Sequence, residues 1–179
     1  MCRTKEYMMK KIECDYKLLN FKYGYLIEQM DNGLFQLKYQ VWDDGKSWNW
    51  NFPPGWAGID NDSSVHIYQY IEDAKRDGNA FLIQKAAHQV ISIGKTYAVW
   101  FWNENESLVA KQPINNLKIY SSDYQELWSI SEFFGSDEMC SGLHKADESK
   151  IYFYTFSGIG VTLEVKDGNI NCVEKKLVK

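Results

Sequence analysis

The segment Phe21–Val41 reads FKYGYLIEQMDNGLFQLKYQV and carries the clearest secondary-structure signal in the 179-residue chain. On both sides of Asp31-Asn32-Gly33, large apolar side chains alternate with other residues, which is the pattern of two half-buried strands. Asn-Gly supplies the two positive-φ residues of a tight hairpin turn. The segment therefore predicts an antiparallel hairpin with one face against the core and the other face in water.

Further strands are predicted downstream of this hairpin. Thr96–Trp102 reads TYAVWFW and is apolar on both faces, which indicates a central strand that is covered from both sides. Asp167-Gly168 predicts a turn within a closing meander of strands. Shorter strands are expected at residues 108–111, 117–120 and 151–156.

Apolar residues recur at helical spacing in three segments, which predict three helices. The first would be capped by Ser63 or Ser64 and would end at Gly78. The second would run over residues 82–94, with a strand over residues 90–93 as the alternative. The third would begin at Ser122 with the form of a capping box and stop at Gly135.

Together these elements predict the α+β class: a mainly antiparallel sheet with two or three helices packed against it. The length favours one domain over residues 1–179. Residues 1–18 carry no clear pattern and are expected to form a loosely ordered arm. The polar residues 136–149 are expected to form an exposed loop.

The composition excludes several classes of function. A formal charge of −4 argues against nucleic-acid binding, because such proteins usually gather Lys and Arg on one face. The sequence contains no apolar run of 18 residues that could span a membrane. The charged N-terminus lacks the apolar core of a secretory signal, so the cytoplasm is the expected location. The four cysteines have no recognisable metal or redox spacing, so neither a cofactor nor a metal is expected. The sequence leaves the oligomeric state open.

The most unusual stretch is Val41–Gly58, which holds four of the seven tryptophans in a segment rich in Gly, Pro, Asn and Asp. Its polar backbone limits how deeply all of these rings can be buried, and Trp is common in binding hot spots. The alternative is that the rings are structural and close the core. The predicted binding residues are Trp48, Trp50, Trp56, Asp43, Asp44, Asp60 and Asp62.

Catalytic signals are weak. Cys140 and His144 have a spacing that would suit a nucleophile with its base, but a small buried cysteine beside a solvated histidine is far more common. Asp60–Ser64 begins like a calcium loop but lacks the glycine and the glutamate that such a loop needs. The sequence therefore predicts no catalytic residue, and an enzyme is the less favoured class.

The favoured hypothesis is a small acidic protein that docks on another protein. In general character the chain resembles the immunity proteins that neutralise bacterial toxins, although no motif supports a residue-by-residue match. That resemblance implies a basic toxin domain as the partner, because acidic groups would complement its charge. The alternatives are a small-ligand or carbohydrate-binding module that uses the tryptophans as a platform, and an enzyme without a readable motif.

Overall fold

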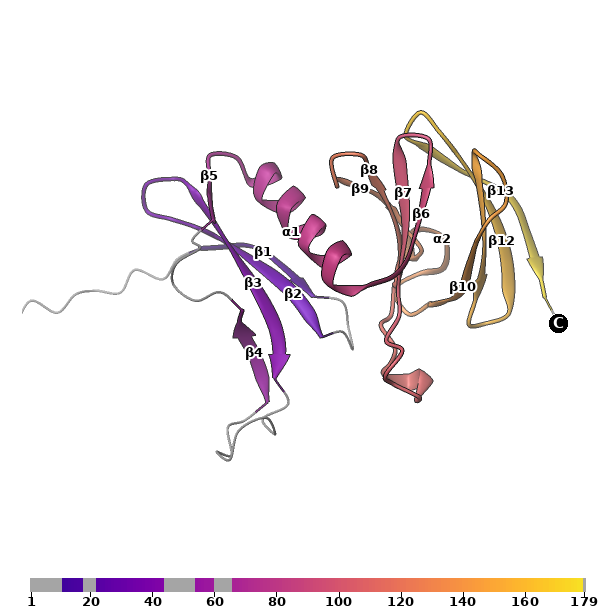
Figure 1. The fold of residues 1–179 in the computed structure, drawn as a ribbon, viewed down its shortest axis with the longest axis horizontal. Coiled ribbons are helices and arrows are strands. Elements are labelled where there is room, and N and C mark those ends of the chain that lie inside the picture. Colours follow the sequence, from indigo (N-terminus) through magenta and orange to yellow (C-terminus); the bar gives the residue numbers. More distant parts are fainter. Residues whose placement is uncertain (1–10, 18–21, 44–53, 60–65, 179) are drawn as a thin grey trace, which may run out of the picture.

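The structure, a computed structural model, describes residues 11–17, 22–43, 54–59 and 66–178 (Figure 1). The described strands form three antiparallel sheets, called here the N-terminal, middle and C-terminal sheets. The N-terminal sheet contains β1 (Lys11–Lys17), β2 (Tyr23–Gln29), β3 (Phe35–Asp43), β4 (Gly55–Gly58) and β5 (His66–Tyr68). Strand β2 lies between β1 and β3, and the other edge of β3 is shared by β4 and β5.

Helix α1 (Ile71–Ala86) packs on β2 and β3 of the N-terminal sheet. Glu72 and Asp73 lie in its first turn and Lys85 in its last turn, an order of charge that suits the helix dipole. Strand β6 (Ala87–Ile93) begins at the residue that follows the helix. The helix and the middle sheet are therefore joined without a loop.

The remaining elements form two four-stranded meanders. The middle sheet has the order β6-β7-β8-β9, and the C-terminal sheet has the order β10-β11-β12-β13. The elements are β7 (Thr96–Phe101), the 3-10 helix η1 (Val109–Lys111), β8 (Leu117–Ser121), β9 (Glu126–Ser129), α2 (Ser131–Phe134), β10 (Cys140–Lys145), β11 (Lys150–Thr155), β12 (Ile159–Lys166) and β13 (Asn169–Leu177).

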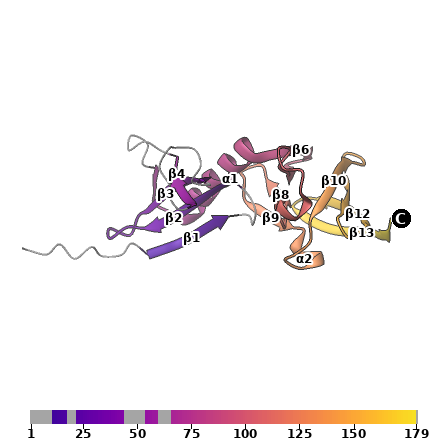
Figure 2. The same cartoon turned by 90° about the horizontal axis from the view of Figure 1, so that it is seen from below.

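The middle sheet is covered on both faces, as Figures 1 and 2 show. In β7, Ala98 and Trp100 join the core shared with the C-terminal sheet, while Val99 and Phe101 join the core shared with α1 and the N-terminal sheet. This alternation follows from the period of two along a strand. The prediction of a doubly covered central strand over Thr96–Trp102 is thereby confirmed.

The predicted α+β class is wrong. Strands take about 55% of the described residues and helices about 16%, and the strands form three sheets instead of one. Among the described residues only α1 is a long helix, because α2 has four residues. The fold is a stack of antiparallel sheets with one helix between the first two.

Gly78 explains the first of the helix errors. Its predicted role was to end a helix, but it lies in the middle of α1 and is buried. A Cβ at this position would lie 2.8 Å from three ring atoms of Tyr25. Glycine is therefore present because it allows the helix to approach the sheet closely. Ser63 and Ser64 fall outside the described residues, but the predicted helix start is wrong, because His66–Tyr68 form strand β5 and the helix begins at Ile71.

The other two predicted helices are largely strands. Residues 82–86 belong to α1, but residues 87–93 form β6, so the alternative of a strand over Val90–Ile93 was the correct one. In place of the helix after Ser122, the chain turns, forms β9 and adds the single turn of α2. Strand β6 is stabilised by pairing with β7, and β9 by pairing with β8. The spacing of apolar residues within one segment contains no information about such pairing.

The predicted hairpins are present, but the turn of the first hairpin differs from the expected Asn-Gly turn. The first hairpin is closed by a three-residue loop in which Gly33, but not Asn32, has a positive φ. The Met30 N–H donates to the Leu34 carbonyl, and the Met30 carbonyl accepts from the Gly33 N–H. At the last hairpin, Asp167 and Gly168 both have positive φ, which is the type I′ geometry.

Two strands were missed in polar segments and one was predicted in error. β1 lies inside the stretch left without structure, where it pairs with β2. β10 lies in the predicted loop 136–149, and a register shift between Cys140 and Gly142 interrupts its alternation. The predicted strand 108–111 is the short helix η1.

Candidate functional site

The candidate site is an open depression of about 490 Å³ above α1. Its lining comes from three separate parts of the chain: the exposed side of α1, strand β3 and the turn between β8 and β9. The lining residues are Tyr39, Asp77, Ala80, Phe81, Gln84 and Tyr124. Three aromatic rings, one carboxylate and one amide therefore converge on one concave place.

The wall on the side of β3 is a stack of aromatic rings. Tyr39 and Phe81 stack with their centroids 4.2 Å apart and an interplanar angle of 21°. Tyr23 packs edge-on against Phe81 at 6.3 Å, and His66 packs edge-on against Tyr39 at 5.3 Å. Because each ring is held by another ring, this wall needs little ordering when a ligand arrives.

The carboxylate of Asp77 is oriented by Tyr68, whose hydroxyl donates a hydrogen bond to Oδ2 at 2.7 Å. Burial of Tyr68, together with this hydrogen bond, raises the pKa of its phenol, so the phenol remains a donor at neutral pH. The other oxygen, Oδ1, lies 3.9 Å from Arg76 Nε. The Asp77 side chain is still 46% exposed, so its carboxylate remains accessible from the depression.

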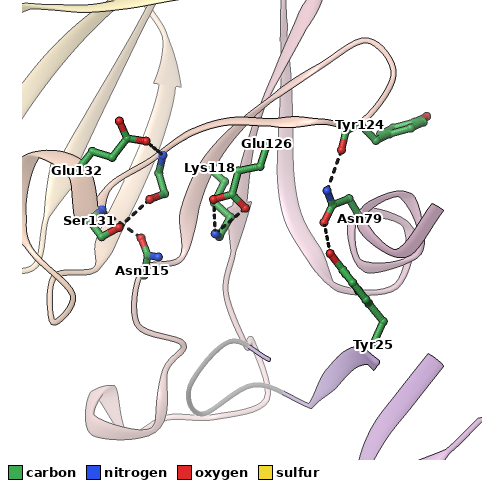
Figure 3. Close-up of polar contacts among 9 residues, drawn as sticks. Tyr25, Asn79, Asn115, Lys118, Tyr124, Glu126, Ser131 and Glu132 are labelled. Carbon is green, nitrogen blue, oxygen red and sulfur yellow. Dashed lines mark hydrogen bonds and ion pairs between the residues drawn. The ribbon is translucent and has the colours of Figure 1, made fainter. Parts of the chain in front are cut away.

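Tyr124 forms the opposite wall from a strained backbone position. Its φ is +63°, which is the left-handed region that a bulky residue rarely adopts. The Tyr124 carbonyl accepts a hydrogen bond from Asn79 Nδ2 at 2.9 Å (Figure 3). The Tyr124 ring stacks on Tyr97 with centroids 6.1 Å apart. These contacts hold the ring beside α1 in spite of the strain.

The chemistry of the depression suits a cation attached to a flat or apolar stem. Aromatic faces attract cations, and a carboxylate adds a charge-assisted hydrogen bond. A guanidinium group can use both, because it stacks on rings and donates to carboxylates. No sequence motif marks this site, since its residues are spread from position 39 to position 124.

No protein-family model matches the chain, and no curated protein matches it. The functional inference therefore rests on the geometry of the described residues and on the sequence. In that part of the chain, no helix has the length and apolar character that a membrane crossing requires.

The predicted binding residues that the structure describes, Trp56 and Asp43, do not line the depression. Trp48, Trp50, Asp44, Asp60 and Asp62 fall outside the described residues. Trp56 lies on β4 opposite Trp42 of β3, with centroids 5.7 Å apart and an interplanar angle of 70°, and Lys17 Nζ lies 5.2 Å from the Trp56 ring centroid. Asp43 ends β3 opposite Gly55. Three aromatic or acidic residues of the stretch Val41–Gly58 are described, and none of them lines the depression: Trp42, Asp43 and Trp56.

Trp42 follows Tyr39 by three positions in β3, so the two side chains lie on opposite faces of the N-terminal sheet. The structure therefore separates the tryptophan pair from the depression. The sequence could have suggested Tyr39 only as a core position of the first hairpin.

Cys140 and His144 do not form a nucleophile–base pair. The Cys140 side chain lies in the core and donates to the Gly142 carbonyl, whereas His144 is exposed and packs edge-on against Tyr154. Burial raises the pKa of the Cys140 thiol to about 12, which keeps it protonated and unreactive. Within the described ranges, no group of three His, Cys, Asp or Glu side chains is arranged to hold a metal ion.

Proposed function

We propose that this chain is a non-enzymatic binding protein for a basic protein partner, of the kind in which an immunity-type inhibitor neutralises a toxin domain. In this proposal the depression above α1 receives an arginine or lysine side chain of the partner. The observation that carries the proposal is the position of the Asp77 carboxylate among the rings of Tyr39, Phe81 and Tyr124.

Charge supports this choice of partner. The chain has a formal charge of −4, and opposite charges on two proteins speed their encounter and disfavour wrong partners. Within the site, a cation over an aromatic face contributes about 0.5–1 kcal/mol at an exposed position and more once water is excluded. A hydrogen bond to the Asp77 carboxylate would contribute about 1.5–3 kcal/mol.

Neither alternative has comparable support from the described residues. A sugar platform needs rings that present a common face, but Trp42 and Trp56 are inclined at 70°. An enzyme needs a reactive group within reach of a base, and the Cys140 thiol is buried on the face of β10 opposite to His144. The described residues therefore favour the protein-binding proposal.

Selection from a random peptide library displayed on phage would test the proposal. We expect the enriched peptides to contain Arg or Lys next to an apolar residue. Their affinity should fall about tenfold or more in Asp77→Asn, which keeps the side-chain shape and removes the charge. Tyr124→Ala should also weaken binding, because it removes one ring of the depression.

Glu72→Gln is the matched control. It removes one negative charge from the same helix, but Glu72 lies outside the depression and pairs with Lys75 at 2.9 Å. We expect Glu72→Gln to bind the selected peptides as the wild type does. Enrichment of peptides without basic residues, or equal losses in Asp77→Asn and Glu72→Gln, would contradict the proposal.

A further inference from the structure

Strand β13 is the outer strand of the C-terminal sheet and lies at the margin of the molecule (Figure 1). Among the described strands it pairs only with β12. Residues 171–177 are all exposed, including Val173 at 55% and Leu177 at 70%. An exposed edge with apolar side chains is a surface to which another strand can add.

The hydrogen bonds of β12 define which backbone groups of β13 face outward. Val178 N donates to Gly158 O, and the register continues as Gly160 with Lys176 and Thr162 with Glu174. In an antiparallel ladder, hydrogen-bonded and non-hydrogen-bonded pairs alternate. The N–H and C=O groups of Lys175 and Leu177 therefore point away from β12.

We infer that β13 pairs antiparallel with β13 of a second copy of this chain, with the two-fold axis at Lys175. In this register Glu174 lies opposite Lys176 of the partner subunit, and Val173 lies opposite Leu177 of the partner subunit. Each of these two pairs occurs twice because the contact is symmetric. The two C-terminal sheets would join into one continuous sheet of eight strands.

The charges of facing side chains favour this register over the registers with the axis at a neighbouring residue. An axis at Glu174 would set two glutamates against each other, and an axis at Lys176 would set two lysines against each other. An axis at Val173 would leave Glu174 opposite Cys172 of the partner subunit. The axis at Lys175 also meets a like pair, but each Lys175 ammonium lies 4.1 Å from the ring centroid of its own Phe134, on the inner face of the sheet.

Lysines and bulges on an edge strand can also prevent pairing. Here the register shift between Thr162 and Leu163 of β12 bends β13 near Val173, so the free segment is limited to residues 173–177. Lys176 lies 3.4 Å from Glu174 of its own strand, so the two charges are already neighbours on the outer face. In the paired state each lysine gains a second carboxylate.

Sedimentation velocity over a concentration series tests the inference. We expect the wild type to shift from monomer to dimer as its concentration rises. Glu174→Lys and Lys176→Glu should each remain monomeric, because each places like charges opposite one another. The double variant Glu174→Lys/Lys176→Glu should dimerise again, because it restores opposite charges in the same register.

Glu148→Lys is the control for net charge. Glu148 is 95% exposed in the loop before β11, and its change to lysine alters the total charge by the same amount as Glu174→Lys. It should dimerise as the wild type does. A wild type that stays monomeric at every concentration, or a double variant that stays monomeric, would overturn the inference, and so would loss of dimer in Glu148→Lys. Unchanged melting temperatures of the variants would show that they remain folded.

A disulfide tests the register directly, in a Cys172→Ser background. Lys175→Cys places two thiols across the axis, where paired Cα atoms lie about 5.5 Å apart, within the range of a disulfide. Asn171→Cys places its two thiols about 27 Å apart along the strands, so it should not crosslink. Crosslinking through residue 171 and not through residue 175 would refute the proposed axis. Both outcomes are independent of peptide binding at α1.

Discussion

The Tyr25 hydroxyl donates a hydrogen bond to Asn79 Oδ1, and the two atoms are 3.0 Å apart. The amide nitrogen of the same Asn79 donates to the Tyr124 carbonyl at 2.9 Å (Figure 3). Asn79 is 5% exposed, and its bond to Tyr25 is buried while its bond to Tyr124 is partly buried. One side chain of α1 thus links the N-terminal sheet to the turn that forms a wall of the depression.

Asn79→Ala should lower the free energy of unfolding by about 1–3 kcal/mol, because it leaves a shielded hydroxyl and a carbonyl without their partner. Urea denaturation measures this change. Lys85→Ala, at an exposed position of the same helix, should change the stability by less than about 0.5 kcal/mol. Equal stabilities of the two variants would mean that Asn79 does not carry the link.

Gly78→Ala should destabilise the protein although alanine favours helix. The better helix propensity is worth about 1 kcal/mol, but a Cβ 2.8 Å from the Tyr25 ring forces the helix and the sheet apart, at about 1–3 kcal/mol. Thermal or urea unfolding measures the net effect. Ala80→Gly gives the propensity difference in the same helix at a half-buried position. A Gly78→Ala variant more stable than the wild type would refute the packing argument.

The same glycine shows what could be predicted from the sequence. Alternation along a strand is a local property, so the hairpin of β2 and β3 and the doubly covered strand β7 follow from the residues themselves. The reason for Gly78 is a ring that lies 53 positions earlier in the chain, and no local pattern contains it. Strand β6 was ambiguous for a similar reason, because its pairing with β7 decides between helix and strand.

The candidate site was beyond sequence reasoning. Tyr39, Asp77 and Tyr124 are brought together by the packing of α1 and by the β8–β9 turn, and each would pass as an ordinary core or surface residue. Tyr124 was expected in a helix, because the sequence gives no sign of its positive φ. The tryptophan-rich stretch drew the prediction to Val41–Gly58, of which only Val41–Asp43 and residues 54–58 are described.

Because the Cys140 thiol is buried, we expect the folded protein to lose stability in mild alkali. Burial raises the pKa of its thiol from the ordinary value of 9.0 to about 12, so the folded state keeps a proton that the unfolded state releases. The stabilisation is therefore complete below pH 9 and is lost as the pH rises towards 12, at up to about 1.4 kcal/mol per pH unit.

Urea unfolding at pH 8, 9 and 10 would measure this dependence. Burial also raises the pKa values of Tyr16, Tyr25 and Tyr120, so their contributions begin only above the tyrosine range near pH 10. Cys140→Ala should reduce the slope between pH 9 and pH 10, whatever its effect on the absolute stability. An unchanged slope would assign the alkaline loss to other groups.

We expect the hydrogen bonds of Gln112 to hold the segment between β7 and β8 in place. Its buried amide accepts a hydrogen bond from Asn103 N at 2.8 Å and donates to the carbonyls of Asn103 and Glu106 at 2.8 and 2.7 Å. Gln112→Ala removes all three bonds, so the segment should open more often, by about 1–3 kcal/mol in local stability.

Hydrogen exchange of residues 103–111 and the rate of tryptic cleavage after Lys111 would both report this opening. Leu108→Ala is the control, because Leu108 is 56% exposed and its side chain makes none of these three bonds. Faster exchange in Gln112→Ala but not in Leu108→Ala is expected. Equal rates in the two variants would refute the role of the amide.

Each described sheet is built from one uninterrupted stretch of the chain, since β1–β5, β6–β9 and β10–β13 follow one another without exchange of strands. The contacts within a sheet are therefore close in sequence, which favours rapid folding. During synthesis the N-terminal sheet and α1 would leave the ribosome before the strands that cover them. The side of the helix that faces Val99, Phe101 and Tyr120 would remain exposed until β8 emerges, so that interval is when the nascent chain is most prone to aggregate.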